Sequence, residues 1–353
     1  DTDININILI YDSTKNSRCQ YIIKKNMGNN GERMNDRSDG GMTERKTDLA
    51  MEVRESFPRD NVEIKGVVLE KKRDEKSGAK ITVVEIKDEK GSKAMKKPQG
   101  TYITIESEEL LHDDEDNENL LLCICEELER MVKGLRKKRV LIAGLGNRHV
   151  TSDSLGPRMV EEIFVTRHYE NEFGRDFMKK HQYGNVSAIA PGVMGQTGME
   201  AGEVLKGVVE KTHPELVIVV DALAARSLSR VCTTVQLTDT GISPGSGIGN
   251  VRKALSKETL GVPVVAVGIP TVVDARTIIS DHLEQVLTKQ GYREWEREQF
   301  IREVLQEETK NLFVTPKNVD ESVRILAKGL AKVMNYCLQK KSEVYFGENM
   351  DTL

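Results

Sequence analysis

Two aspartates, each associated with an apolar strand pattern, are the residues best placed to do chemistry. Residues 141–157 read as an apolar strand, a glycine turn and a helix start, with Asp153 just before the helix. A second apolar run, residues 216–220, ends at Asp221. Sites in open α/β sheets form beyond the carboxyl ends of the strands, so we expect Asp153 and Asp221 to face each other across one crevice. Two nearby carboxyls that share a proton can act as base toward water and as acid toward a peptide bond.

Each aspartate also has a purely structural interpretation. Asp153 precedes an expected helix, where Ser152, Asp153 or Ser154 would be a typical N-cap. Asp221 follows five apolar residues, where a carboxylate is costly unless it is satisfied, for instance by the N-terminus of a neighbouring helix. Local sequence alone does not decide between these structural roles and a catalytic role.

Two glycine-containing motifs suggest other chemistries, and each departs from its pattern. A dinucleotide fingerprint beginning at Gly144 would need its third glycine where His149 stands. The triplet that begins at Asp239 matches the aspartic-protease triplet, but it occurs once and in an α/β context. We interpret Asp239 as a loop anchor, and the following loop, with Gly245 and Gly247, as a substrate-binding segment. A non-catalytic module that binds a phosphate or a peptide through residues 241–250 is an alternative.

A metal-assisted peptidase is the other alternative, with Asp153 and Asp221 holding a cation and His149 as a third ligand. The six histidines show no paired ligand spacing, so we predict no metal and no cofactor. Asn147 is a further candidate for substrate contact. Backbone amides of the glycine loops, or Arg226, are candidates for stabilising an oxyanion.

The elements that position these residues follow from hydrophobic periodicity. Strands are expected at 62–69, 80–86, 101–105, 140–145, 186–190, 216–221, 231–237 and 263–268. Helices are expected at 120–135, 155–168, 199–211, 275–289, 294–309 and 318–338, and a short one opens near residue 47 with Thr47 or Asp48 as N-cap. Unbroken apolar runs are typical of buried parallel strands. The pattern predicts an α/β fold in which a mostly parallel twisted sheet is flanked by helices and carries extra N-terminal strands.

Composition limits the remaining classes. The chain has 353 residues, of which 38% are hydrophobic and 31% charged, and a formal net charge of −4. This charge gives no electrostatic case for nucleic-acid binding. The sequence contains no apolar run of about 18 residues, so we expect no membrane span. Five scattered cysteines indicate reduced thiols. Residues 1–45 are rich in breakers and predict little regular structure.

Several long motifs, in the same order, resemble the germination protease (spore protease) of endospore-forming bacteria. The resemblance runs from about Thr47 to Leu338. It is carried by the motifs at residues 45–50, 100–104, 144–157, 165–168, 191–195, 220–227, 239–250, 256–261, 268–274 and 312–317.

This resemblance implies an endopeptidase that degrades small acid-soluble spore proteins during germination. It implies a cytoplasmic enzyme of the spore core, made as a self-processing zymogen and assembled as a homotetramer. The fold would be phosphorylase/hydrolase-like and similar to that of the hydrogenase-maturation endopeptidases. By that similarity, Asp153 and Asp221 carry over as the catalytic pair. Processing would fall between Asp48 and Leu49. The expected organisation is therefore a leader at 1–48, one peptidase domain at 49–340 (N-terminal strands and helix at 49–135, core at 136–340) and a tail at 341–353.

Overall fold

The structure, a computed structural model, describes residues 4–12, 17–25, 47–57, 64–112, 117–245, 252–305 and 312–339. The chain divides into two compact units, Asp1–Met42 and Thr43–Leu353. In the first unit, strands β1 (Ile4–Asp12) and β2 (Ser17–Lys25) pair antiparallel. They lie in the segment for which composition predicted little regular structure. The alternation of Ile and Asn at residues 4–8 has the two-residue period of a strand, a signal outweighed by the breakers that follow it.

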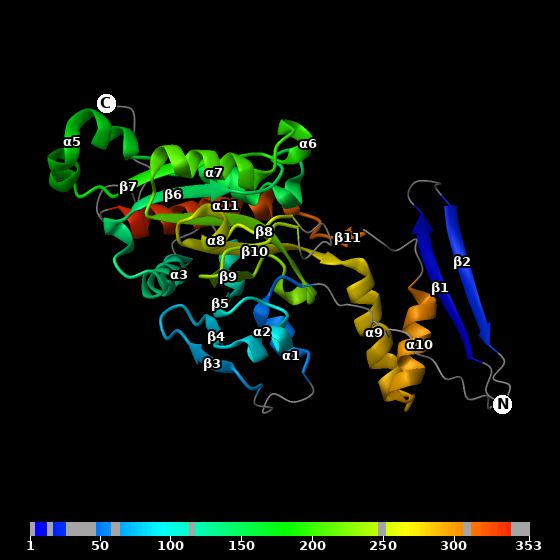
Figure 1. The fold of residues 1–353 in the computed structure, drawn as a ribbon. Helices are drawn as coiled ribbons and strands as arrows, with labels where there is room; N and C mark the ends of the chain where they lie inside the picture. Colours follow the sequence, from blue (N-terminus) through cyan, green and yellow to red (C-terminus); the bar gives the residue numbers. More distant parts are fainter. Residues whose placement is uncertain are drawn as a thin grey trace. The chain divides into compact units, whose positions relative to one another are not determined.

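The second unit is built on a nine-stranded sheet (Figure 1). Its strands are β3 (Val67–Arg73), β4 (Lys80–Ile86), β5 (Gly100–Glu106), β6 (Arg139–Gly144), β7 (Asn185–Ile189), β8 (Leu216–Ala225), β9 (Thr234–Thr238), β10 (Val264–Asp274) and β11 (Phe313–Val314). Their order is β3-β4-β5-β9-β10-β8-β6-β7, and β11 pairs with β10. Strands β10, β8, β6 and β7 pair in parallel, whereas β3, β4, β5, β9 and β11 pair antiparallel. The α/β fold with added N-terminal strands is thus confirmed.

Alternate residues of the central strands pack on opposite faces of the sheet, as the pleat requires. On β8, Ile218 and Val220 belong to one apolar cluster, whereas Val217 and Val219 belong to another. The first cluster includes residues of α3 (Glu118–Met131), α4 (Leu155–Glu161) and α11 (Val319–Leu338). The second includes residues of α7 (Ala201–Thr212) and α8 (Lys257–Leu260). Helices therefore cover both faces of the parallel strands.

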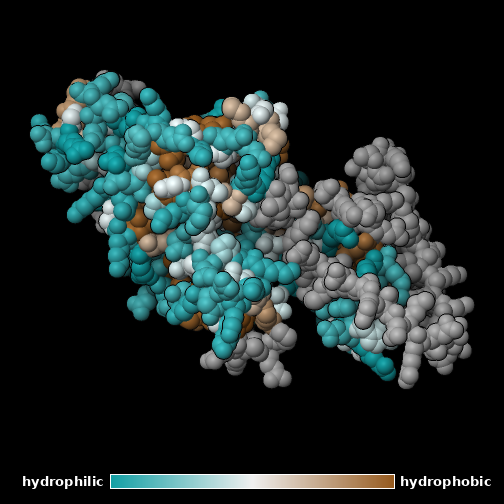
Figure 2. Space-filling view, in the orientation of Figure 1, coloured by the Kyte–Doolittle hydropathy of each residue, from teal (hydrophilic) through white to brown (hydrophobic). Residues whose placement is uncertain are grey.

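The remaining helices are shorter or lie outside these two layers. They are α1 (Ala50–Glu55), α2 (Glu89–Met95), α5 (Arg167–His181), α6 (Met194–Thr197), α9 (Ala275–Lys289) and α10 (Glu294–Val304). Short 3-10 turns are η1 (Glu108–Leu111), η3 (Leu135–Lys137), η4 (Thr151–Asp153) and η5 (Leu228–Arg230). Helices α9 and α10 share a small core of their own around Leu287 and Ile301. Hydrophilic residues cover much of the described surface on the face in Figure 2.

Three local expectations were wrong. The single helix expected at 155–168 ends at Glu161, and α5 follows, because the backbone N–H of Thr166 donates to Val186 of β7. The N-cap of α1 is Leu49, without a side-chain bond. Cys125 of α3 and Cys337 of α11 form a disulfide, where reduced thiols were expected. Within the described ranges, no helix is long and apolar enough to span a bilayer.

Candidate active site

Asp221 lies within β8, between two parallel neighbours. The preceding strand residues pair with β6 on one side and with β10 on the other, so the backbone is fixed from both directions. The side chain is only 6% exposed, and one carboxylate oxygen accepts the backbone N–H of Ala222 at 3.0 Å. Strand β8 continues to Ala225 rather than ending at residue 221 as expected. Asp221 is therefore a buried carboxyl on a strand that is paired on both sides.

Asp153 ends the short turn η4 between β6 and α4. Its Oδ2 atom accepts the backbone N–H of Asn147 at 2.8 Å, which closes the loop after β6 around the carboxyl. The N-cap of α4 is Ser154, so Asp153 is not the N-cap that local sequence suggested. The hydroxyl of Thr271 on β10 donates to the carbonyl of Ser152 at 2.6 Å and ties this turn to the sheet.

Glycine at two positions allows the two aspartate-bearing segments to approach each other. Gly146 has a φ of +112°, and a Cβ there would lie 2.0 Å from the carbonyl oxygen of Asp153. Gly156, in the first turn of α4, packs against Leu145 just after β6 and against Val220 of β8. A Cβ at Gly156 would lie 2.4 Å from the carbonyl oxygen of Leu145 and 2.6 Å from that of Val220. Main-chain contact, without an intervening side chain, therefore sets the spacing of the two segments.

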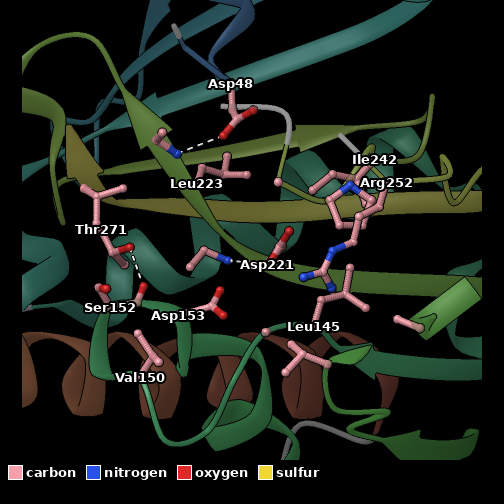
Figure 3. A pocket seen from close by; sticks show the side chains of 18 of the residues that line it. Asp48, Leu145, Val150, Ser152, Asp153, Asp221, Leu223, Ile242, Arg252 and Thr271 are labelled. Carbon is pink, nitrogen blue, oxygen red and sulfur yellow. Dashed lines mark hydrogen bonds between the residues drawn. The ribbon is translucent and has the colours of Figure 1, made fainter. Parts of the chain in front are cut away.

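Both carboxyls line one cavity of about 270 Å³ (Figure 3). It lies beyond β6, between the η4 turn, the second half of β8, β10 and the loop after β9. Its lining residues are Asp48, Leu145, Gly146, Val150, Ser152, Asp153, Gly192, Val193, Ala201, Asp221, Ala222, Leu223, Ala224, Ile242, Ser243, Pro244, Gly245, Arg252, Thr271, Val272 and Phe313. The sequence prediction that Asp153 and Asp221 share a crevice agrees with this arrangement.

Burial in the cavity favours the protonated form of both carboxyls. Burial raises the pKa of Asp153 above its ordinary value, although the Asn147 N–H and the charge of Arg252 act against the shift. Burial raises the pKa of Asp221 well above its ordinary value, and the charges of Asp153 and Asp48 raise it further. A pair in which one carboxyl is protonated and the other ionised is the charge state that general acid–base hydrolysis needs.

Asp48 brings the segment before α1 into the same cavity. Its backbone N–H donates to the carbonyl of Ala224, and its Oδ2 accepts the Ala224 N–H, both at 2.9 Å. Its carbonyl oxygen accepts hydrogen bonds from Lys97 at 2.9 Å and from Gln236 at 3.1 Å. The amide oxygen of Gln236 in turn accepts the N–H of Ala50 at 2.7 Å, so Gln236 spans the Asp48–Leu49 bond.

The first turn of α1 is anchored separately, through Glu52. This carboxylate is 1% exposed and accepts the backbone N–H groups of Arg226 at 2.7 Å and Ser227 at 3.0 Å. Arg230 pairs with it at 3.2 Å and also with Glu55 and Glu106. The hydroxyl of Thr47 also donates to Glu52. These bonds fix α1 to the segment that follows β8.

Of the other sequence-predicted residues, Gly245 lines the cavity and four do not. Asn147 acts through its backbone, and its side-chain oxygen accepts hydrogen bonds from His149 N–H and Gln196. His149 is exposed. Arg226 forms a two-pronged ion pair with Asp281, and Asp239 accepts the N–H of Thr101 at 2.8 Å, as a loop anchor would. Gly247 lies outside the described residues.

The positions of His149 and Arg226 correct two expectations. Because His149 is exposed and does not line the cavity, the metal-assisted alternative lacks the third ligand that we expected. Within the described ranges, no three His, Cys, Asp or Glu side chains are grouped so as to hold a metal ion. Arg226 pairs with Asp281 and does not line the cavity, so its position does not match the oxyanion role considered for it beside the backbone amides.

Sequence reasoning missed three residues: Arg252, which lines the cavity, and Lys97 and Gln236, which bind Asp48. Arg252 lines the cavity and stands just after the glycine-rich loop that the sequence singled out. Lys97 and Gln236 line a second cavity of about 220 Å³, which shares Asp48 with the first. No local motif marks these two residues, because only the pairing of β5, β9 and β10 brings them beside Asp48.

With this geometry established, the comparisons with known proteins decide the family. The sequence model of the germination protease family matches residues 44–296. The chain belongs to the germination protease family. Germination protease from Caldanaerobacter subterraneus subsp. tengcongensis is 44% identical over 314 residues, covering 83% of this chain and 94% of that protein. Germination protease from Bacillus subtilis strain 168 is 39% identical over 349 residues, covering 84% and 94%. The chain is therefore a protease of spore germination.

Among solved structures, a NiFe hydrogenase maturation protease from Thermococcus kodakarensis KOD1 is similar at a TM-score of 0.33 and 18% identity. The match covers 60% of this chain and 98% of that one.

Proposed function

We propose that this germination protease is an aspartic-type endopeptidase in which Asp153 and Asp221 act as a pair that shares one proton. The observation that carries the proposal is the convergence of these two carboxyls, both with raised pKa, on one cavity. The ionised carboxyl takes a proton from water as the water oxygen attacks the peptide carbonyl carbon. The protonated carboxyl gives its proton to the leaving nitrogen as the C–N bond breaks. The pair thus ends with the same number of protons, and we assign no fixed role to either member.

The substrates that we propose are small acid-soluble spore proteins, cleaved in the spore core by a cytoplasmic homotetramer without direct contact to nucleic acid or membrane. These assignments rest on the family. We further propose that residues 1–48 are a propeptide that the enzyme removes between Asp48 and Leu49. The position of Asp48 in the wall of the cavity supports this proposal. The leader would then also hinder substrate access before processing, which gives latency without a change in the aspartate pair.

The test is a cleavage assay on a purified small acid-soluble spore protein. Asp153→Asn and Asp221→Asn should each abolish cleavage, because an amide cannot exchange the proton, while thermal unfolding shows an intact fold. Asp239→Asn is the matched control. Full activity in either dyad variant would remove that residue from the mechanism.

N-terminal sequencing of the self-processed chain tests the leader. Processing should speed up as the pH falls toward about 5–6, where one carboxyl of such a pair holds a proton. A mature end far from Leu49, or processing that persists in Asp221→Asn without another protease, would contradict the scheme.

A further inference from the structure

The cavity has an unbalanced set of charges. Three carboxyl groups line it, those of Asp48, Asp153 and Asp221, and among its described lining residues Arg252 is the one basic side chain. Figure 3 shows the Arg252 side chain reaching from the wall at Ile242 into the space that Asp221 and Asp153 face. A single cation thus stands beside the proposed acid–base pair.

Arg252 is held by an anchored end of the loop after β9. Ile242 and Leu255 form an antiparallel bridge with hydrogen bonds of 3.0 and 2.7 Å, and Leu255 is 1% exposed. The backbone N–H of Arg252 donates to Pro244 across the same bridge at 3.3 Å. The Arg252 side chain therefore extends from a backbone position that is hydrogen-bonded next to this bridge.

Other cations near the cavity are already engaged. Arg226 binds Asp281 through two nitrogens at 2.8 and 2.9 Å. Lys97 lines the second cavity and donates to the carbonyl of Asp48. Within the described ranges no ion pair involves Arg252, so its guanidinium is available to a bound substrate.

Given the proposed aspartate pair, we propose that Arg252 is a third catalytic residue, which binds the carbonyl oxygen of the scissile peptide and stabilises its negative charge in the transition state. When water attacks, the carbonyl π electrons move to oxygen. The protonated carboxyl must deliver its proton to the leaving nitrogen, so the oxyanion needs another source of positive charge. A fixed guanidinium supplies it without reorganisation. When the C–N bond breaks, the oxygen regains its double bond and Arg252 is unchanged.

The effect of Arg252 on both aspartates supports this position. Its positive charge acts to lower the pKa of Asp153 and that of Asp221. Because this cation acts on both carboxyls, a substrate carbonyl oxygen bound between them would also lie within its electrostatic field. Removing this charge should therefore change the pH dependence as well as the rate.

The experiment compares Arg252→Gln and Arg252→Lys with the wild-type enzyme on a small acid-soluble spore protein, after self-processing or with processing followed separately. Lys253→Gln is the matched control, because Lys253 is the exposed neighbour. Arg252→Gln should lower kcat by about 10²–10³-fold with a smaller change in KM. Arg252→Lys should recover part of the loss. The pH–rate profile of Arg252→Gln should move to higher pH, because both aspartates lose a charge that lowers their pKa. Lys253→Gln should behave as wild type.

Wild-type kcat in a folded Arg252→Gln enzyme would overturn the proposal, and so would a rise in KM with kcat unchanged. If Arg252→Gln does not fold, Arg252→Lys decides: an unchanged kcat and pH profile would overturn the proposal, and a lowered kcat would support it. Asp153→Asn and Asp221→Asn are assayed in parallel. Activity in those variants refutes the aspartate pair itself, whereas inactive aspartate variants beside a fully active Arg252→Gln refute Arg252 alone.

Discussion

Gly156→Ala should disturb the spacing of the two aspartates without touching either side chain. A Cβ at this position would lie 2.4 Å from Leu145 O, 2.5 Å from Leu145 N and 2.6 Å from Val220 O, all main-chain atoms. Ordinary contact begins at 3.4 Å, so α4 would have to retreat by up to roughly 1 Å, because strand ends cannot rotate aside as a side chain can. Asp153 lies just before α4, and Asp221 follows Val220, so their separation should change with it.

Two opposing free-energy terms set the stability change. Overpacking costs about 1–3 kcal/mol, and replacing glycine by alanine in a helix returns about 0.5–1 kcal/mol. We expect a net loss of about 1–2 kcal/mol, or a few degrees in Tm. A displacement of about 1 Å at the reacting groups can lower kcat by about 10²-fold, so activity should fall far more than stability.

Thermal unfolding and the cleavage assay, measured on the same preparations, test both numbers. Gly207→Ala is the control, because a Cβ there meets nothing within 4 Å. That variant should keep full activity and be neutral or slightly more stable. Gly156→Ala with wild-type Tm and kcat would refute the argument that main-chain contact sets the spacing.

Three further predictions concern the buried carboxylates and the loop anchor. Burial raises the pKa of Asp221 in the folded protein, so protonated Asp221 stabilises the fold fully below the unfolded pKa, and this stabilisation is lost as the pH rises through the folded pKa. Asp221→Asn should therefore raise Tm at pH 7–8 but hardly at about pH 4. An equal change in Tm at both pH values would contradict the raised pKa. Glu52→Ala should cost about 3–5 kcal/mol in unfolding free energy, because two backbone N–H groups lose their acceptor, at about 1–3 kcal/mol each, and Arg230 loses one of its three carboxylate partners. A denaturation midpoint near wild type would show that water replaces the carboxylate. Asp239→Asn should change unfolding free energy by less than about 1 kcal/mol, since an amide oxygen can still accept the Thr101 N–H, and a complete loss of cleavage would move Asp239 into the mechanism.

The central part of the fold was predictable because its signals are local. The unbroken apolar runs before Asp221 and through Val264–Val267 mark buried parallel strands. Once two such strands are neighbours, their carboxyl ends must lie at one edge of the sheet, which brought Asp153 and Asp221 together in the prediction. The end of β8 was misplaced because its pairing with β10 continues past Asp221 to Ala225, across an irregularity between Pro270 and Val272.

Side-chain direction and distant neighbours could not be predicted in this way. His149 and Asn147 lie in the correct loop, but whether a loop residue turns inward depends on hydrogen bonds such as that between Asn147 and Gln196. Arg226 follows Asp221 closely in sequence and still binds Asp281 on α9. Asp48 reaches the cavity through Ala224 and Gln236, far along the chain, so only the folded sheet shows that it belongs there.

Gln236 forms hydrogen bonds on both sides of the Asp48–Leu49 bond, and this bears on the direction of the proposed processing. Ala224, Lys97 and Gln236 hold the chain before this bond, and Glu52 holds the helix after it. If the bond is cut, these contacts keep the new carboxylate and the new amine close together at a high effective concentration. The cut therefore releases little conformational entropy of the chain. Hydrolysis and resynthesis would then be nearly balanced at this one bond. The step that makes maturation irreversible would be the departure of the leader from Ala224 and Lys97, rather than the chemistry of the cut.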